Sequence, residues 1–444
     1  MIRLLSLLTL FTSIWFTNLQ AQPDFDYVNR TYLSNINTVR LNVAGFPHSY
    51  PVISLNGTAQ LRLSFDDMSD EVRRYTYRIV HCNRDWTPSN LSPLEYTSGF
   101  SEGSVEDYNF SFRTLSEYIH YDLYFPNQDI EVTKSGNYML VVTDDEDEEI
   151  TAITRRFMVT ENIAGVSGQV NRATNVSKIH SHQEVDFSTN TKQLRLRNPL
   201  QELRGVVLQN GRWDNAITDI SPTLIRQESV IFNHQGKVSF AGGNEFRNLD
   251  IRSISAPRAD VLDISNEGTN YAMVLKPDIL RDQEIFLNYA DVNGDFINFS
   301  SDEPIINISD DFQDFDRLNL DFTGDYINMT FILKTGTEFE RDDVYLFGGF
   351  SEFKKKRKYK MTYNPAINSY VAKIMLKQGF YNYWYVTNRD AFGELAEKPS
   401  FSLERTEGNF DEAENDYIVL IYYRPIGGRY DQLIGHEILN SNFN

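Results

Sequence analysis

Short runs of alternating apolar and polar residues, separated by turn residues at roughly every eight to twelve positions, are the dominant pattern in this chain of 444 residues. In TVRLNV, for example, Val39, Leu41 and Val43 alternate with polar residues, and YTYRI repeats the pattern from Tyr75 to Ile79. Each run places its apolar side chains on one face of a sheet. Helical periodicity is hard to find in any window longer than about ten residues. The pattern predicts an all-β protein built from tandem immunoglobulin-like or fibronectin-like β-sandwich domains.

Composition supports the same fold and excludes one class of partner. The chain has 25 Tyr and 30 Phe, residues that favour strands. Its single cysteine, Cys82, excludes an internal disulfide framework, so the cores must be held by packing. The formal net charge of −20 repels nucleic acid, and we expect no nucleic-acid partner.

The first residues indicate export. MIRLLSLLTLFTSIWFTNLQAQ has one early cation, an apolar run and a small residue, Ala21, before Gln22. This is the pattern of a secretory signal peptide at residues 1–21. Nothing else in the chain has the roughly 18 consecutive apolar residues that a transmembrane helix needs. We therefore expect an exported protein with no transmembrane segment of its own.

The remaining chain divides at changes of pattern. We expect, in order, a tail or an added edge strand at 22–36, a first β-sandwich at 37–160, a second β-rich domain at 161–310, and a C-terminal immunoglobulin-like domain at 311–444. The last domain follows the acidic stretch SDDFQDFDRL and has six strand-like runs, which is the size of an immunoglobulin-like sandwich. In its run GFYNYWYV, strand geometry places Tyr381, Tyr383 and Tyr385 on one face, and Trp384 and Val386 on the other.

No set of residues predicts an enzyme. GFSEG at 99–103 matches the G-x-S-x-G nucleophile elbow, but that mechanism needs a strand, a sharp turn and a helix, and the flanking sequence is strand-rich. SEFK at 351 and KTG at 334 occur in the reverse order of the penicillin-binding motifs that they resemble. His180 and His182 lack a third metal ligand. We expect no catalytic residues, no metal site and no cofactor.

Two acidic stretches raise the question of calcium. DDEDEE at 144–149 lies between two strand-like runs, where a solvated hairpin tip accounts for it without a ligand. DVNGD at 291–295 lacks the glycine and glutamate spacing of an EF-hand loop. Its Asn-Gly pair is a strong signal for a hairpin turn, so we interpret both stretches as turns.

The stretch FGGFSEFKKKRKYKM, residues 347–361, is the one concentration of positive charge. VYLFGGFSEF followed by YNYWYV is similar to the starch- and glycogen-binding modules of branching enzymes, with Phe353 at the position of their tryptophan. This similarity covers about 45 residues and supports the sandwich fold more than sugar binding. We interpret the basic run as a solvated loop, and also as the candidate site of contact with an acidic partner or with anionic lipid head groups. The candidate residues are Lys354, Lys355, Lys356, Arg357 and Lys358.

Considered as a whole, the chain resembles the plug proteins of the type 9 secretion system of Bacteroidota. The resemblance rests on an ordered set of segments across most of the chain: TVRLNVAGFPHSYPVISLNGTAQLRLSFDD, YTYRIVHCNRDWTPSNLSPLEYTSGF, SGNYMLVV, GNEFRNLDIRS, DVYLFGGFSEF with LKQGFYNYWYV, and DYIVLIYYRPIGGRYDQLIG. It implies a non-enzymatic periplasmic protein at the periplasmic side of the outer membrane. The implied partner is the large outer-membrane β-barrel translocon, whose periplasmic opening the plug closes. The alternative is a periplasmic or surface glycan-binding β-sandwich protein, which would expose Trp384 or Phe353.

Overall fold

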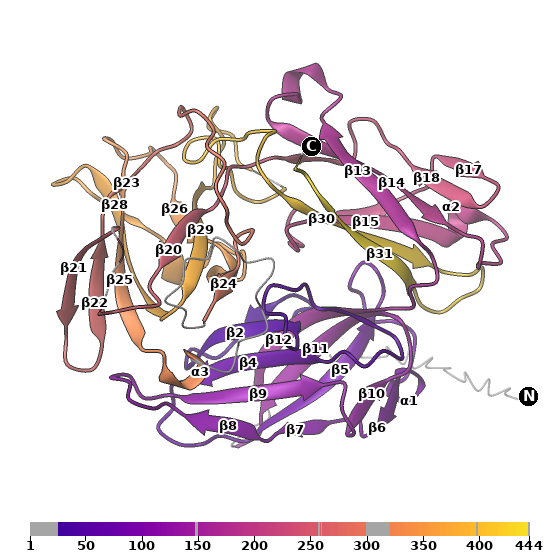
Figure 1. The fold of residues 1–444 in the computed structure, drawn as a ribbon, viewed down its shortest axis with the longest axis horizontal. Helices are drawn as coiled ribbons and strands as arrows, with labels where there is room; N and C mark the ends of the chain where they lie inside the picture. The colour runs from indigo at the N-terminus through magenta and orange to yellow at the C-terminus, as the bar shows by residue number, and fades with distance from the viewer. Residues whose placement is uncertain are drawn as a thin grey trace, which may run out of the picture.

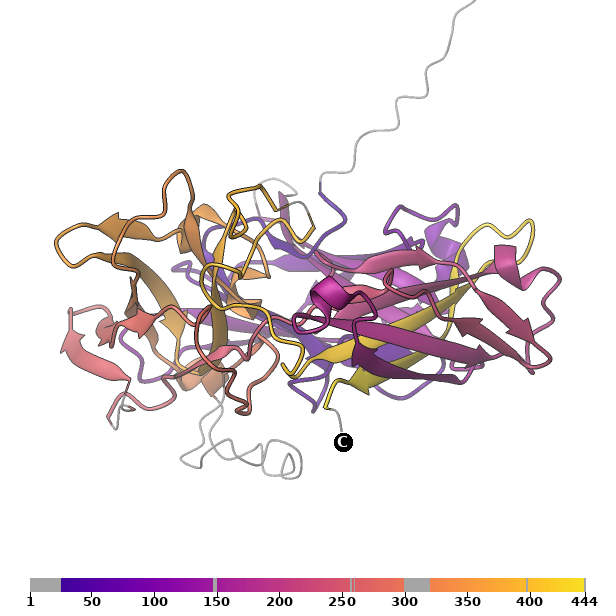
Figure 2. The same cartoon turned by 90° about the horizontal axis from the view of Figure 1, so that it is seen from above.

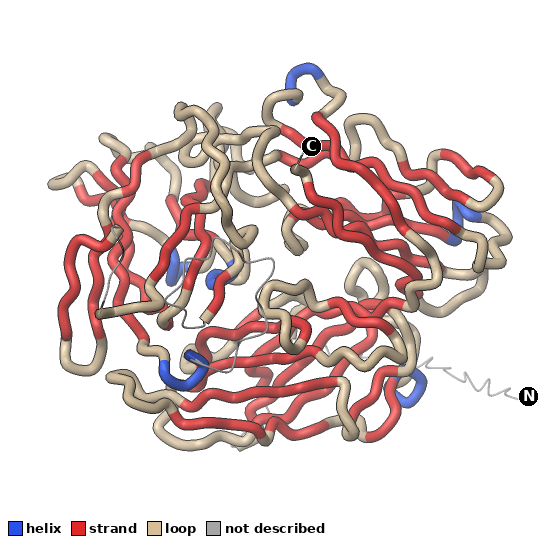
Figure 3. Tube along the Cα trace, viewed as in Figure 1, coloured by secondary structure: helices blue, strands red, loops and turns tan. Residues whose placement is uncertain are grey.

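The computed structural model describes residues 25–146, 150–255, 258, 260–298, 320–396 and 398–442. The expected signal peptide at 1–21, the SDDFQDFDRL stretch and part of the DDEDEE tip lie outside these residues. Strands dominate every described region, and the helical segments are single turns (Figures 1 and 3). The predicted all-β sandwich fold is therefore confirmed. No helix in the described part of the chain is both long and apolar enough to cross a membrane.

The first sandwich faces two sheets against each other. The larger sheet has the order β1-β12-β11-β5-β7, with β3 beside β12: β1 (Arg30–Thr31), β12 (Ile150–Thr160), β11 (Gly136–Asp144), β5 (Tyr75–Cys82), β7 (Gly103–Val105) and β3 (Val52–Ser54). The other sheet has the order β2-β4-β9-β8: β2 (Ile36–Val43), β4 (Leu61–Asp67), β9 (Ile119–Phe125) and β8 (Asp107–Phe110). A short pair, β6 (Thr97–Gly99) and β10 (Ile130–Val132), follows the single-turn helix α1 (Pro93–Tyr96).

Alternation in the sequence builds this core as expected. Leu61, Leu63 and Phe65 of β4 pack with Tyr75 and Tyr77 of β5, and all five are buried. Of the two alternatives for the segment before β2, the structure has the added edge strand, because β1 pairs with β12.

The middle sandwich combines two distant parts of the chain. One sheet has the order β13-β14-β18-β17, with β19 beside β14: β13 (Val166–Arg172), β14 (His182–Asn190), β18 (Ser229–Phe232), β17 (Leu224–Arg226) and β19 (Ser239–Ala241). The other has the order β16-β15-β30-β31: β16 (Ile217–Ile220), β15 (Leu203–Gln209, after the single-turn helix α2, Pro199–Glu202), β30 (Asp416–Tyr423) and β31 (Gln432–Asn440).

This pairing crosses the boundary expected at residues 310 and 311. The C-terminal strand β30 was expected in the last domain but pairs with β15 along its whole length. The physical reason is that both faces of β30 are apolar and buried. Tyr417, Val419 and Ile421 enter the core of the middle sandwich, while Ile418 and Leu420 pack against the first sandwich. A strand with two apolar faces needs a sheet that is covered on both sides.

The third region is built around the aromatic strand β29. One sheet has the order β21-β22-β25-β28-β27, with β23 beside β25: β21 (Val261–Asn266), β22 (Tyr271–Leu275), β25 (Tyr326–Lys334, after the single-turn helix α3, Leu320–Thr323), β28 (Ser369–Lys377), β27 (Thr362–Asn364) and β23 (Asp278–Ile279). The facing sheet has the order β20-β29-β24, with β26 beside β29: β20 (Arg247–Asp250), β29 (Phe380–Thr387), β24 (Phe296–Ile297) and β26 (Val344–Phe347).

The predicted division of the β29 side chains between two faces is confirmed. The three tyrosines enter the larger core of the third region, while Trp384 and Val386 enter a smaller cluster on the other face. Strands β20 and β24 precede the expected boundary but belong to this region, as their pairing with β29 shows.

The first sandwich contacts both of the other regions (Figures 1 and 2). Its contact with the middle sandwich is apolar, because Met139 and Val141 of β11 pack with Leu208 of β15 and Leu420 of β30. Cys82 belongs to this buried cluster, and burial raises the pKa of its thiol to about 12. The thiol therefore acts as a small apolar group in the core. The contact with the third region is different in kind and is polar.

Candidate functional site at the junction of the three regions

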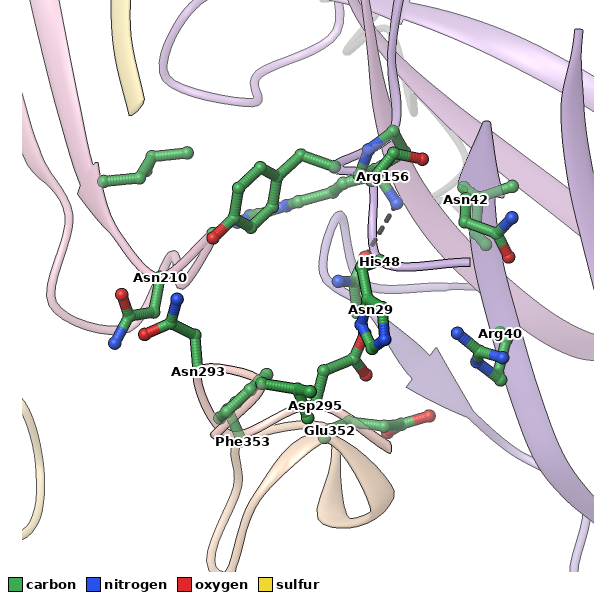
Figure 4. A pocket seen from close by; sticks show the side chains of 18 of the residues that line it. Asn29, Arg40, Asn42, His48, Arg156, Asn210, Asn293, Asp295, Glu352 and Phe353 are labelled. Carbon is green, nitrogen blue, oxygen red and sulfur yellow. Dashed lines mark hydrogen bonds between the residues drawn. The ribbon is translucent and has the colours of Figure 1, made fainter. Parts of the chain in front are cut away.

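A cavity of ≈310 Å³, lined by both polar and apolar residues, lies where the three regions meet. Figure 4 shows amide, carboxylate and cationic side chains around it. The first sandwich contributes Arg40 and His48, the middle sandwich contributes Asn210, and the third region contributes Asn293 and Asp295. A second cavity of ≈320 Å³ lies between the first and third regions and shares part of the same wall. The junction therefore brings polar and charged side chains of all three regions close together.

Arg40 lines one side of the first cavity. It extends from β2, its guanidinium donates to the carbonyl of Pro47, and it lies over the ring of Phe296, 5.5 Å from the centroid. Burial, together with the charge of Arg40, lowers the pKa of the nearby His48 to about 3. The imidazole is therefore neutral at physiological pH.

The DVNGD stretch forms the opposite wall and is a turn, as predicted. Asn293 and Gly294 have φ angles of 53° and 84°, the left-handed conformations that an Asn-Gly turn adopts. The Asp291 carboxylate accepts hydrogen bonds from the backbone N–H groups of Asn293 (2.7 Å) and Phe246 (2.6 Å). Burial raises the pKa of Asp291 to about 7. A carboxylate held this way caps the turn.

Glu352 and Arg155 join the first sandwich to the third region in the wall shared by both cavities. The Glu352 carboxylate accepts from Arg155 Nη2 at 2.8 Å and from the Thr31 hydroxyl at 2.7 Å, and it also pairs with Lys356. Burial alone would raise the pKa of Glu352, but Arg155 and Lys356 lower it to about 2. Glu352 and Phe353 both have positive φ angles, 58° and 50°, which is a strained backbone conformation. The contacts of Glu352 with Arg155, Thr31 and Lys356 hold this conformation in place.

The structure corrects the interpretation of the basic run as a solvated loop. Lys354, Lys355 and Lys356 are half-buried between two short 3₁₀ turns. The Lys354 ammonium donates to the backbone carbonyl of Asn29 in the first sandwich, at 2.5 Å. Burial lowers the pKa of Lys354 to about 8. The local sequence does not predict the contacts of Lys354 and Lys355, because their partners Asn29 and Asn388 lie in other segments, whereas Lys356 pairs with the neighbouring Glu352.

The other members of the run differ in exposure. Lys355 donates to the Asn388 side chain at 2.6 Å, within the third region. Arg357 and Lys358 are exposed, and Lys358 donates at 3.3 Å to the Asn37 side chain of the first sandwich. The contact of these five residues with a partner protein remains a prediction.

A second ionic cluster, which the sequence did not predict, fixes the same two regions to each other. Asp66 on β4 is fully buried and accepts from Lys377 Nζ (2.7 Å), His120 Nδ1 (2.6 Å) and the Tyr326 hydroxyl (2.6 Å). Lys377 and Tyr326 belong to the third region, whereas Asp66 and His120 belong to the first sandwich. Burial alone would lower the pKa of His120, but Asp122 and Asp66 raise it to about 9.

Arg62 completes this cluster by donating to Asp122 and to Asp321, each at 2.6 Å. His120, Asp122 and Asp321 are the one group of described residues whose ligand atoms are close enough together to hold a metal ion. Three positive groups, Arg62, Lys377 and the imidazolium, already face the three carboxylates. A protonated imidazole does not bind a metal, so the geometry favours an ion-pair network.

The motifs considered for catalysis are separated from this junction. Ser101 of GFSEG is exposed between β6 and β7, and no helix follows it. His180 is exposed, and His182 Nδ1 lies 2.8 Å from the Ser181 hydroxyl. Neither histidine belongs to the metal-compatible group of the described residues.

The aromatic residues of the glycan alternative do not form a sugar platform. Trp384 is only 2% exposed, and its indole N–H donates to the carbonyl of Asn244. Its ring stacks on Phe246 with the centroids 3.6 Å apart. Phe353 is half-buried in the wall of the first cavity. A ring that stacks on a protein side chain is not available to stack on a sugar.

Comparison with known proteins agrees with the fold and defines the class. A family model described as "Type 9 secretion system plug protein 1st domain" matches residues 36–161, which form the first sandwich. A crystal structure of a hypothetical protein from Parabacteroides merdae ATCC 43184 has 31% sequence identity and a TM-score of 0.84, covering 94% of this chain and 100% of that chain. Collagen adhesin from S. aureus aligns with a TM-score of only 0.11 and 9% identity, and it carries no argument. No curated protein sequence matches the chain.

The chain is therefore a multi-sandwich β-protein whose first domain is that of a secretion component. It belongs to the family of type 9 secretion system plug proteins. This family points to a part of a secretion machinery and not to an enzyme.

Proposed function

We propose that this protein is the periplasmic plug subunit of the type 9 secretion system. It binds the periplasmic opening of the large outer-membrane β-barrel translocon and closes that opening sterically. The observation that carries this proposal is the family match over the first sandwich, together with a relative of the same fold over 94% of the chain.

The architecture supports a steric role. The first sandwich is fixed to the middle sandwich by an apolar cluster and to the third region by buried ion pairs. Three sandwiches held in this way form one broad body, which can block a wide pore without any chemistry. Binding requires only an interface of ordinary size, roughly 1,600 Å² in total, with an apolar centre and a polar rim.

Affinity purification tests the proposal. The tagged mature protein is expressed in its host, the cell envelope is solubilised gently, and the captured proteins are identified by mass spectrometry. We expect recovery of a very large outer-membrane barrel that an unrelated periplasmic protein with the same tag does not recover. Capture of no barrel, or the same capture by the control, would contradict the plug function.

A further inference from the structure

Strand β8 is an edge strand of the first sandwich, and its outer side has no partner strand in the described chain. It ends the sheet β2-β4-β9-β8, so only one of its two edges is paired within the described chain. All four of its residues, Asp107 to Phe110, are exposed. Natural proteins usually protect such an edge, because it offers unpaired backbone groups to other chains.

The side chains at this edge belong by geometry to the core. Tyr108 pairs with Tyr121 and Phe110 with Ile119, and paired residues of neighbouring strands share a face. Tyr121 and Ile119 are buried in the core, yet Tyr108 is 43% exposed and Phe110 is 61% exposed. The facing sheet ends at the three-residue strand β7, and it leaves these two rings uncovered.

Alternate backbone N–H groups of β8 point away from β9, toward the position where one more strand would pair. The N–H of Ser111 donates back to Tyr118 beside β9, so in the alternating antiparallel pattern the N–H groups of Tyr108 and Phe110 point outward. The next outward N–H, that of Phe112, already donates to the carbonyl of Phe322 at 2.7 Å. Phe112 is 54% exposed and continues the line of aromatic rings. We call Tyr108, Phe110 and Phe112 the β8 aromatic edge.

Acidic residues predominate in the sequence around the β8 aromatic edge. Glu102, Glu106, Asp107 and Glu117 are exposed, and within the described part of the chain none of them forms an ion pair. Arg113, the residue after Phe112, lies over the Phe112 ring, 5.0 Å from its centroid. A ligand for this edge must therefore bring positive charge to the rim of an aromatic strip.

We propose that the β8 aromatic edge binds an extended segment of the translocon by strand addition. The segment has apolar side chains at alternate positions, which cover Tyr108 and Phe110, and Lys or Arg residues beside them, which face the acidic rim. This inference rests on the proposed function and adds the docking surface to it. The edge lies inside residues 36–161, which match the family domain, whereas the exposed edge strands β17 and β21 lie outside them.

Barrel capture by matched variants tests the proposal. In the full-length protein, Tyr108→Ser with Phe110→Ser removes the rings, while Leu224→Ser with Ile225→Ser is the control on the β17 edge. The two control side chains are similarly exposed, 47% and 45%. We expect the β8 variant to capture at least about tenfold less barrel than wild type and the β17 variant to capture an unchanged amount. Both variants should keep the wild-type Tm, because the substituted side chains are at the surface.

A photoreactive amino acid at Phe110, with one at Ile225 as control, provides a measurement that does not depend on losing binding. We expect a cross-link to the barrel from position 110 only. If wild type captures the barrel and the β8 variant captures it equally, the docking surface is elsewhere and the plug function stands. Capture of no barrel by wild type overturns both proposals. A dimer of the purified protein that the β8 variant dissociates would identify a second copy as the occupant and overturn strand addition by the translocon.

Discussion

At the residue scale, the buried charges at the junction were the least predictable part of the molecule. Asp66 and His120 lie inside strands whose other residues alternate as expected, in SFDD and IHYDLYF. Their position within a strand-like run indicates a buried ion pair, because a buried charge needs a partner. The partner itself could not be found in this way, since Lys377 is 311 positions from Asp66.

The raised pKa of His120 predicts how stability depends on pH. The imidazolium faces Asp66 on β4, Asp122 on β9, Asp321 on α3, and the positive charges of Lys377 and Arg62. The pKa of His120 is about 9 in the folded protein and about 6.5 in the unfolded chain. The free energy by which the charged imidazolium stabilises the fold is therefore fully present below pH 6.5. It is lost as the pH rises through 9.

The measurement compares the free energy of unfolding of wild type and His120→Gln by urea titration between pH 6 and pH 9.5. We expect the difference between the two proteins to shrink by roughly 3 kcal/mol over this range. Titrating groups away from His120 are common to both proteins and cancel in the comparison, while Asp66 and Asp122, whose pKa values His120 lowers, stay ionised over this pH range. A difference that stays constant with pH would show that His120 is not charged in the folded protein.

At the element scale, local pattern predicted strands and faces well, and it predicted their pairing poorly. The two faces of β29 followed directly from alternation in GFYNYWYV. The pairing of β30 with β15 did not, because an apolar run fits any sheet that can cover both of its faces, and no local residue selects one. Strand partners far apart in sequence are chosen by the packing of the whole chain.

Because both faces of β30 are buried, alanine substitutions in β30 and in its neighbour β31 should differ greatly in their cost in unfolding free energy. Leu420→Ala removes a fully buried side chain between two regions and should cost about 2–5 kcal/mol of unfolding free energy. Ile438→Ala on the paired strand β31, where the side chain is 45% exposed, should cost less than about 1 kcal/mol. Denaturant unfolding of both variants measures the two values, and equal costs would contradict the covered position of β30.

At the scale of the whole molecule, the first sandwich makes two kinds of contact with its neighbours, and we expect a substitution to open one contact without opening the other. Its contact with the middle sandwich is apolar, whereas its contact with the third region depends on Glu352 with Arg155 and on Lys377 with Asp66. The combined variant Glu352→Ala and Lys377→Met leaves Arg155 and Asp66 buried without these partners. Breaking a buried pair in this way is strongly unfavourable, about 3–5 kcal/mol for each pair.

Hydrogen exchange measured by mass spectrometry distinguishes the two contacts. In the combined variant we expect amides in residues 30–40 and 349–358 to exchange at least about tenfold faster than in wild type, because the polar contact opens locally. Amides of β11 and β30 at the apolar contact should keep their wild-type protection. Lys373→Met, with an exposed side chain on the same strand as Lys377, is the control and should change neither set. Uniformly faster exchange across all three regions would mean that the molecule opens as a single unit, whereas acceleration confined to the first set places a hinge between the first sandwich and the third region.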